Sequence, residues 1–236
     1  RYALQQVTER YTNYQRRNQK VLEESPSPLM TPELRDAMQK AAVAAAKACG
    51  YCNAGTIEFL VDHERNFYFM EMNTRIQVEH PVTEWVTGID LVQTQLRIAQ
   101  GEPLPFTQED ITLRGHAIEC RINAENPDCN FRPSPGTIQA LHLPGGMGVR
   151  IDSAIYQGYT IPPYYDSMIA KLIVHAPTRK EAIQKMRWAL SEFLVDGVET
   201  NIDFQLRLLK TEAFEQGTYD NAFLMHWLED SKHKQS

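Results

Sequence analysis

The feature that most constrains the fold of this chain is an alternation of side chains from Phe67 to Glu79. In an extended strand, residues two apart share a face. The odd positions are all polar from residue 71 onward, whereas the even positions stay mostly apolar. This run therefore predicts a strand with one polar face and one apolar face, continuing towards Glu79.

A second β-prone run, Gly55 to Val61, precedes the first and is joined to it by the polar segment 62–66. Two such runs with a short polar connection predict a β-hairpin. The hairpin can place Glu58 across from Glu71, where two carboxylates repel each other unless a cation joins them. The carboxylates of Glu58 and Glu71, together with the amide oxygen of Asn73, are ligands suited to magnesium or manganese.

A strand that faces water on one side gives the same alternation, and antiparallel sheets often do so. Three details favour a functional polar cluster instead: the run has no lysine, Asn and Arg alternate with carboxylates, and the run leads directly into His80-Pro81. Arg75 offers a planar fork for a small oxyanion, Gln77 and a backbone N–H can add donors, and Glu79 can act as a general base.

Caps and chain breakers predict the remaining elements. The expected helices are one from Pro32 to about Cys49, two pieces between Pro81 and Gln100 broken near Gly88, one from the Thr178/Glu181 capping box to about Val195, and two more over 202–210 and 221–229. The expected strands are 117–124, 137–143, 149–155 and 168–175. The prolines at 26 and 28 predict no regular structure across 23–28.

Composition excludes several classes of protein. The chain has 236 residues with 42% hydrophobic content, enough for one large or two small domains. Its apolar stretches are shorter than the roughly 18 residues of a membrane span, and a net charge of −6 argues against nucleic-acid binding. No secretory signal opens the chain, so we expect a cytoplasmic protein.

The four cysteines include one close pair, Cys49 and Cys52, which is formally a redox or zinc half-site. No second pair of this spacing exists, and Cys120 alternates with isoleucines. We therefore expect reduced structural thiols.

The run Glu71–Pro81, which reads EMNTRIQVEHP, closely resembles biotin carboxylase, an ATP-grasp enzyme. Further segments resemble the same family: 15–20, 55–58, 119–125, 163–168 and 196–201. The resemblance implies an α+β fold, with the C-terminal part of an ATP-grasp domain over residues 1–105. A biotin carboxylase C-terminal domain, a mixed or antiparallel sheet with helices, follows over residues 116–230.

The resemblance also implies roles for individual residues. The implied metal ligands are Glu58, Glu71 and Asn73. The implied bicarbonate site is Lys20, Arg75, Gln77, the backbone of Val78, and Glu79. The implied ATP contacts are Gln15, Lys20, Glu58, Leu60 and Glu71. Arg121 resembles the residue that binds biotin and steadies its enolate, and it joins Glu79 and Arg75 as the catalytic set.

The implied reaction is the carboxylation of biotin on the biotin carboxyl carrier protein, with bicarbonate and ATP carrying Mg²⁺ or Mn²⁺. It is the first half-reaction of acetyl-CoA carboxylase in fatty acid synthesis, and carboxyltransferase subunits are the further partners. Glu79 resembles the base that deprotonates bicarbonate for attack on the γ-phosphate. The resemblance further implies a homodimer, because members of the family form one. Met147 and Arg150 lie at positions where the family makes its dimer contact.

The sequence also departs from the family. We find no glycine-rich loop before Lys20, so we expect the N-terminal domain and the ATP lid to be missing, and residues 9–14 differ from the family pattern. Three alternatives therefore stay open: a catalytically incomplete dimerisation or carrier-docking unit, the equivalent domain of pyruvate or propionyl-CoA carboxylase, and another ATP-grasp ligase such as carbamoyl phosphate synthetase. The motif around Arg121 argues against the last.

Overall fold

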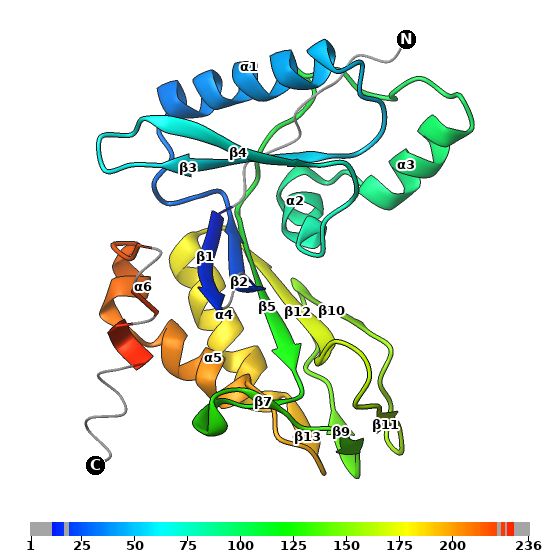
Figure 1. The fold of residues 1–236 in the computed structure, drawn as a ribbon, viewed down its shortest axis with the longest axis vertical. Helices are drawn as coiled ribbons and strands as arrows, with labels where there is room; N and C mark the ends of the chain where they lie inside the picture. The colour runs from blue at the N-terminus through cyan, green and yellow to red at the C-terminus, as the bar shows by residue number, and fades with distance from the viewer. Residues whose placement is uncertain (1–10, 17–18, 221–222, 225, 229–236) are drawn as a thin grey trace. The chain divides into compact units, whose positions relative to one another are not determined.

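The computed structural model describes residues 11–16, 19–220, 223–224 and 226–228, with the backbone alone at 11–16 and 19. The described residues divide into two compact units, each drawn in Figure 1. The first unit contains residues 25–114. The second contains 11–16, 19–24 and the described residues from 115 onward.

The first unit contains the predicted hairpin. Strand β3 (Thr56–Val61) pairs antiparallel with β4 (Phe67–Asn73). Asp62 closes the loop, because its Oδ1 accepts hydrogen bonds from the backbone N–H groups of Glu64 and Asn66. The preceding helix α1 (Pro32–Ala48) begins at Thr31, whose hydroxyl accepts from Leu34 N as an N-cap. Both predictions are confirmed.

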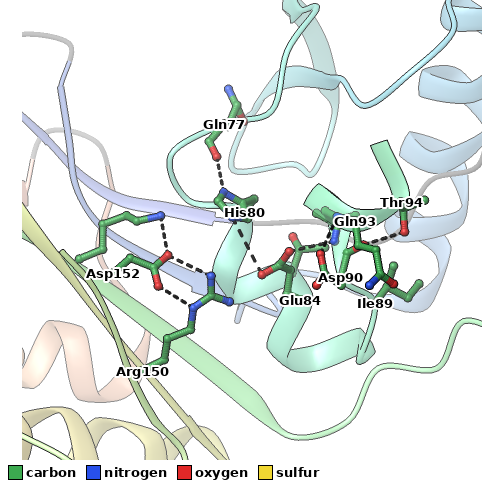
Figure 2. Close-up of polar contacts among 12 residues, drawn as sticks. Gln77, His80, Glu84, Ile89, Asp90, Gln93, Thr94, Arg150 and Asp152 are labelled. Carbon is green, nitrogen blue, oxygen red and sulfur yellow. Dashed lines mark hydrogen bonds and ion pairs between the residues drawn. The ribbon is translucent and has the colours of Figure 1, made fainter. Parts of the chain in front are cut away.

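Two short helices follow the hairpin, α2 (His80–Thr87) and α3 (Leu91–Ala99). Gly88 ends α2 with a φ of 74°, in the left-handed region that glycine tolerates. Asp90 caps α3 by accepting a hydrogen bond from Gln93 N, and Glu84 Oε1 accepts one from Leu91 N at 2.8 Å (Figure 2). The predicted break near Gly88 and the cap at Asp90 are confirmed.

A five-stranded sheet forms the centre of the second unit, in the order β1-β2-β5-β12-β10. These strands are β1 (Tyr11–Arg16), β2 (Gln19–Ser25), β5 (His116–Asn123), β12 (Met168–Ala176) and β10 (Val149–Ser153). All eight residues of β5 are buried. Helices α4 (Arg179–Glu192) and α5 (Ile202–Leu209) pack against this sheet, and α6 (Glu212–Gln216) packs on α5. The α+β class is thus confirmed.

Short elements connect the long strands of this unit. They are β6 (Glu125–Asn126), the 3-10 turn η1 (Pro127–Cys129), β7 (Arg132–Pro133), β8 (Gly136–Thr137), β9 (Ala140–His142), β11 (Thr160–Ile161) and β13 (Leu194–Asp196). They pair as β6 with β7, β8 with β11, and β9 with β13.

Three expectations about secondary structure are wrong. The strand predicted over 137–143 is two pieces, β8 and β9, because each pairs with a different partner. The helix predicted to reach Val195 ends at Glu192, because Phe193 turns extended and Leu194–Asp196 pairs with β9. Residues 23–25 belong to β2, because Pro26 and Pro28 end the strand only after Ser25.

The last predicted helix, 221–229, lies partly outside the described residues; 223–224 and 226–228 are helical. No helix in the described part of the chain is long and apolar enough to cross a membrane.

The four cysteines are free thiols, as predicted. Cys120 lies in the core, where burial, followed by the negative charges of Glu23 and Glu119, raises its pKa well above the ordinary value. A thiol with a raised pKa forms little thiolate and is inert. This supports a structural role for Cys120.

A buried carboxylate on β2 links the sheet to the helical segments of the second unit. Glu24, on β2, has no solvent exposure and accepts hydrogen bonds from His116 Nε2 at 2.6 Å, Arg179 Nε at 2.7 Å and the Tyr219 hydroxyl at 2.6 Å. Burial raises the pKa of Glu24, but the hydrogen bonds from His116 and Arg179 outweigh it and hold the pKa below its ordinary value.

We predict that Glu24→Gln lowers the free energy of unfolding by about 3 kcal/mol, because removing one partner of a buried ion pair leaves the other charge uncompensated. Urea unfolding followed by circular dichroism measures the loss. Asp128→Asn is the control: its exposed pair with Arg207, at 3.8 Å, should contribute less than about 1 kcal/mol. Equal losses in both variants would contradict the prediction.

The lowered pKa of Glu24 also predicts a pH dependence. A carboxylate with a depressed folded-state pKa contributes its full stability above the unfolded value, here 4.5, and loses it as pH falls through the folded pKa. The stability difference between the wild type and Glu24→Gln should therefore be constant near neutral pH and shrink below pH 4.5. Urea midpoints measured from neutral pH downward test this, and a constant difference throughout would refute it.

Candidate functional site

The hairpin of the first unit brings two carboxylates face to face. The register of β3 and β4 pairs Glu58 with Glu71, as predicted. Asn73 Nδ2 lies between them and donates to Glu58 Oε1 at 3.1 Å and to Glu71 Oε1 at 2.9 Å. Gln77 Nε2 also donates to Glu58 Oε1, at 2.6 Å. Two side-chain amides therefore hold the half-buried Glu58 in place.

The strand carrying these residues is shorter than predicted. Strand β4 ends at Asn73, so the alternation expected to continue to Glu79 is wrong beyond that point. The chain instead turns before helix α2, where Pro81 lies in the first turn and favours helical backbone. This turn, rather than strand alternation, brings Gln77 back to Glu58.

His80 clamps the turn at its helical end. Its backbone N–H donates to Gln77 O at 3.2 Å, and its ring Nδ1 lies 2.8 Å from the same oxygen. A carbonyl can only accept, so Nδ1 carries the hydrogen in this contact. Nε2 of the ring faces Glu84 Oε2 at 3.9 Å (Figure 2). The backbone at residues 77–80 is therefore fixed by a side chain that the sequence analysis did not assign.

The turn buries polar groups that the sequence analysis assigned to bicarbonate. Gln77 is 6% exposed and Glu79 is 3% exposed, with Val78 half-buried between them. Glu79 occupies the N-cap position of α2, but its side chain makes no capping hydrogen bond. A buried carboxylate beside groups assigned to substrate is suited to general-base chemistry.

Arg75 differs from these residues because it is exposed. Among the described residues, its terminal nitrogens make only local hydrogen bonds, to Ile76 O at 3.2 Å and to Asn73 Oδ1 at 3.5 Å. The second contact is long for a hydrogen bond and weak. The guanidinium is therefore able to turn towards an incoming anion without breaking a strong interaction.

The hairpin fits a hard divalent cation only as part of a shared site. The described residues contain no group of three or more His, Cys, Asp or Glu side chains able to hold a metal. Glu58 and Glu71 supply two carboxylates, and Asn73 can turn its amide to present Oδ1. Magnesium commonly takes one or two carboxylates and completes its shell with water and nucleotide phosphates. The residues present fit that pattern.

The remaining predicted ATP contacts are spread over both units. Leu60, on β3, is 50% exposed and pairs with Tyr68. Lys20, on β2, is half-buried and pairs with Gln15 of β1. The side chain of Gln15 lies outside the described residues. Leu60 belongs to the first unit, and Lys20 and Gln15 belong to the second.

Arg121, on β5 of the second unit, is held in place by an ion pair with Glu23. It is 8% exposed, and its Nε and one terminal nitrogen donate to Glu23 Oε1 at 3.1 and 2.8 Å. Sequence reasoning missed Glu23, because the prolines after it were expected to prevent a strand. The pair Glu23-Glu24 directly after the apolar Val21-Leu22 was the available signal.

The comparisons with known proteins first define a class. Residues 4–107 match the family model described as the carbamoyl-phosphate synthase L chain ATP binding domain. Together with the paired carboxylates of the hairpin, this match places the first part of the chain in the ATP-grasp class. Residues 119–226 match the biotin carboxylase C-terminal domain.

Relatives of known name narrow the class of protein to a family. Biotin carboxylase 1 of Bacillus subtilis is 59% identical over 92% of this chain and 48% of its own length. A pyruvate carboxylase subunit of Methanothermobacter thermautotrophicus is 57% identical over 92% of this chain and 44% of its own length. The biotin carboxylase domain of Hydrogenobacter thermophilus 2-oxoglutarate carboxylase superposes with a TM-score of 0.91 at 50% identity, over 93% of this chain and 49% of that one.

The chain belongs to the biotin carboxylase family and corresponds to the C-terminal part of its members. It spans about half the length of the relatives that it matches. Both the ATP-binding match and the C-terminal match agree with the fold class predicted from the sequence.

The facing carboxylates predict a metal response. Adding Mg²⁺ at ten times its dissociation constant should stabilise the wild type by about 1.4 kcal/mol, because only the folded hairpin presents both ligands. Glu58→Gln should lose this gain and be as stable as the wild type or slightly more stable without metal, since like charges opposite each other are destabilising. Thermal unfolding with and without MgCl₂ measures both effects. Glu64→Gln, in the exposed loop, is the control; an unchanged response in Glu58→Gln would contradict the assignment.

Proposed function

We propose that this chain carries the carboxylation site of a biotin carboxylase, which uses ATP and bicarbonate to carboxylate biotin. The observation that carries the proposal is the hairpin and the segment that follows it. Glu58 faces Glu71 across the hairpin, and the segment between β4 and α2 buries Glu79. The relative from Hydrogenobacter thermophilus supports it, because that structure is described as a complex with MgADP, ADP and bicarbonate.

In this proposal, the turn residues bind bicarbonate and remove its proton. Arg75 supplies a planar, always charged fork that suits a small oxyanion. Gln77, the N–H of Val78, and Lys20 add donors. Glu79 takes the proton of bicarbonate, so that the resulting dianion attacks the γ-phosphate of ATP and ADP leaves as the bond between the γ-phosphorus and the bridging oxygen breaks. The product, carboxyphosphate, breaks down to carbon dioxide and phosphate. The phosphate takes the proton from biotin N1, and N1 then attacks the carbon of carbon dioxide to give carboxybiotin.

The proposed role of the hairpin carboxylates is to hold the cation that accompanies the triphosphate. Glu58 and Glu71, with Asn73 beside them, would hold Mg²⁺, with Mn²⁺ as the alternative. The bound cation supplies charge neutralisation at the phosphates. The side-chain amides of Asn73 and Gln77 orient Glu58 for this role, because both donate to its Oε1. The remaining ATP contacts of the proposal are Gln15, Lys20 and Leu60.

Arg121 is the proposed biotin residue. A guanidinium beside the ureido oxygen stabilises the negative charge that develops when N1 loses its proton. Its low exposure and its fixed plane suit this role, because a donor that is already oriented needs no rearrangement during the reaction. The biotin would arrive on the biotin carboxyl carrier protein.

The wider assembly is also part of the proposal. We assign the chain to the acetyl-CoA carboxylase reaction, with carboxyltransferase subunits as partners and the cytoplasm as the compartment; the pyruvate carboxylase relative keeps pyruvate or propionyl-CoA as alternative acceptors. A homodimer is supported by the Hydrogenobacter relative, described as a dimer. Met147, 97% exposed, and Arg150, paired with Asp152 at 2.7 Å (Figure 2), are the proposed contacts. The proposed domains are residues 1–105 and 116–230.

A second candidate function is a dimerisation or carrier-docking unit without catalysis of its own. The observation in its favour is that the chain spans about half the length of its relatives. Stable binding of a biotinylated carrier protein, combined with no release of phosphate from ATP in the presence of Mg²⁺, bicarbonate and biotin, would favour this candidate.

Bicarbonate-dependent phosphate release from ATP, with Mg²⁺ and free biotin, tests the proposed function. The purified protein should release phosphate only with bicarbonate, and biotin should stimulate the release. Glu79→Gln should slow the release by about 100-fold or more, the typical contribution of a general base. Arg121→Ala should lower only the stimulation by biotin, by about 100-fold, the typical cost of removing one preorganised donor.

The matched control for Glu79→Gln is Glu64→Gln, which neutralises an exposed loop carboxylate and should leave the rate unchanged. Release that continues in Glu79→Gln at the wild-type rate would rule out the proposed base. Stimulation by biotin at the wild-type level in Arg121→Ala would rule out the proposed biotin residue.

A further inference from the structure

Strand β2 carries two successive glutamates, Glu23 and Glu24, and neither has any solvent exposure. Successive strand residues point to opposite faces of a sheet. Glu24 faces the helices of the second unit, where His116, Arg179 and Tyr219 donate to it. Glu23 faces the other side and contacts Arg121. The two carboxylates therefore serve different parts of the unit.

The contact between Glu23 and Arg121 fixes the plane of the guanidinium. Two donors on one edge of the group, Nε at 3.1 Å and a terminal nitrogen at 2.8 Å, converge on the single oxygen Glu23 Oε1. Charge-assisted hydrogen bonds of this kind are short and directional. A buried ion pair is often no more stable than a well-packed apolar pair of similar volume. Stability alone is therefore a weak reason for this pair, whereas orientation is a direct result of its geometry.

The backbone of Arg121 is held independently of its side chain. Its carbonyl oxygen accepts hydrogen bonds from Asn201 Nδ2 at 3.0 Å and from Gln205 Nε2 at 3.2 Å. Gln205 Nε2 also donates to Val21 O, on β2, at 3.0 Å. Asn201 and Gln205 are themselves buried, at 1% and 0% exposure. One amide therefore joins β2 to β5 beside the residue whose side chain contacts Glu23.

We propose that Glu23 is a positioning residue that holds the Arg121 guanidinium in the plane needed to meet biotin, with Asn201 and Gln205 fixing the backbone beneath it. This inference rests on the proposed function, because it requires Arg121 to contact biotin. Glu23 acts through Arg121 and does not itself touch the substrate. A misplacement of about 1 Å in such a group can reduce a rate by about 100-fold, which sets the scale of the effect.

The test is a double-mutant cycle of Glu23→Gln and Arg121→Ala in the purified protein, with free biotin as the probe. Glu23→Gln removes the charge but keeps the size of the side chain. It should lower kcat/KM for biotin by about 10- to 100-fold, whereas the biotin-independent release of phosphate should stay unchanged. In the Arg121→Ala background, Glu23→Gln should have no further effect, because the group that it positions is gone.

The matched control is Glu24→Gln, at the neighbouring position with equal burial. It should lower thermal stability without changing kcat/KM for biotin, when assayed at a temperature where the variant is folded. If Glu23→Gln does not fold, Glu23→Asp replaces it. Asp keeps the charge but withdraws the oxygen by one methylene, so the same selective loss of biotin kinetics is expected.

Three results would overturn the inference. They are an effect of Glu23→Gln that persists in the Arg121→Ala background, an equal loss of biotin-independent phosphate release, and biotin kinetics equal to those of the wild type. A wild-type protein that shows no biotin-stimulated release would instead overturn the proposed function and, with it, the positioning role of Glu23. Biotin-stimulated phosphate release by the wild type therefore distinguishes a failure of the proposed function from a failure of the positioning role alone.

Discussion

Much of the second unit depends on one constraint, which is that the two buried carboxylates of β2 must each have cationic or hydrogen-bonding partners. An uncompensated charge in a protein interior is strongly destabilising. Glu24 satisfies the constraint with His116, Arg179 and Tyr219, which join strands to helices that are distant in sequence. Glu23 satisfies it with Arg121 on β5. Strand β2 therefore anchors side chains on both faces of the sheet: the contacts of Glu24 lie on the face covered by the helices, and Arg121 is held through Glu23 on the other face.

The hairpin of the first unit meets the opposite requirement, because it holds two like charges together. Glu58 and Glu71 face each other across the ladder, and the amide of Asn73 donates to both. Neutral donors reduce the repulsion but leave the site negative. A local arrangement that lowers stability and remains attractive to a cation is typical of a functional site, since evolution maintains such conflicts only where they serve binding or chemistry.

Local sequence rules predicted the hairpin, its register and most helix ends, because turns, caps and alternation are encoded by neighbouring residues. Thr31, Asp90 and the Thr178/Glu181 capping box are examples. The same rules failed where pairing with distant segments decided the outcome. Residues 23–25 became a strand through their partners, and Leu194 left the helix to pair with His142. Among site residues, Glu23 was missed for that reason, and His80 was missed because its contact to Gln77 arises only after the strand turns.

The two arginines with proposed roles, Arg75 in the first unit and Arg121 in the second, illustrate how the same side chain can serve two roles. Arg75 is exposed and makes only weak local contacts, so it can adjust to a small mobile anion. Arg121 is buried and held through two nitrogens and through its backbone carbonyl. Its guanidinium loses little further conformational entropy when a ligand arrives, because the entropy was lost on folding. In the proposed reaction, bicarbonate is a small anion that Arg75 would capture by charge, whereas the charge that develops on biotin would be met best by a donor already in place.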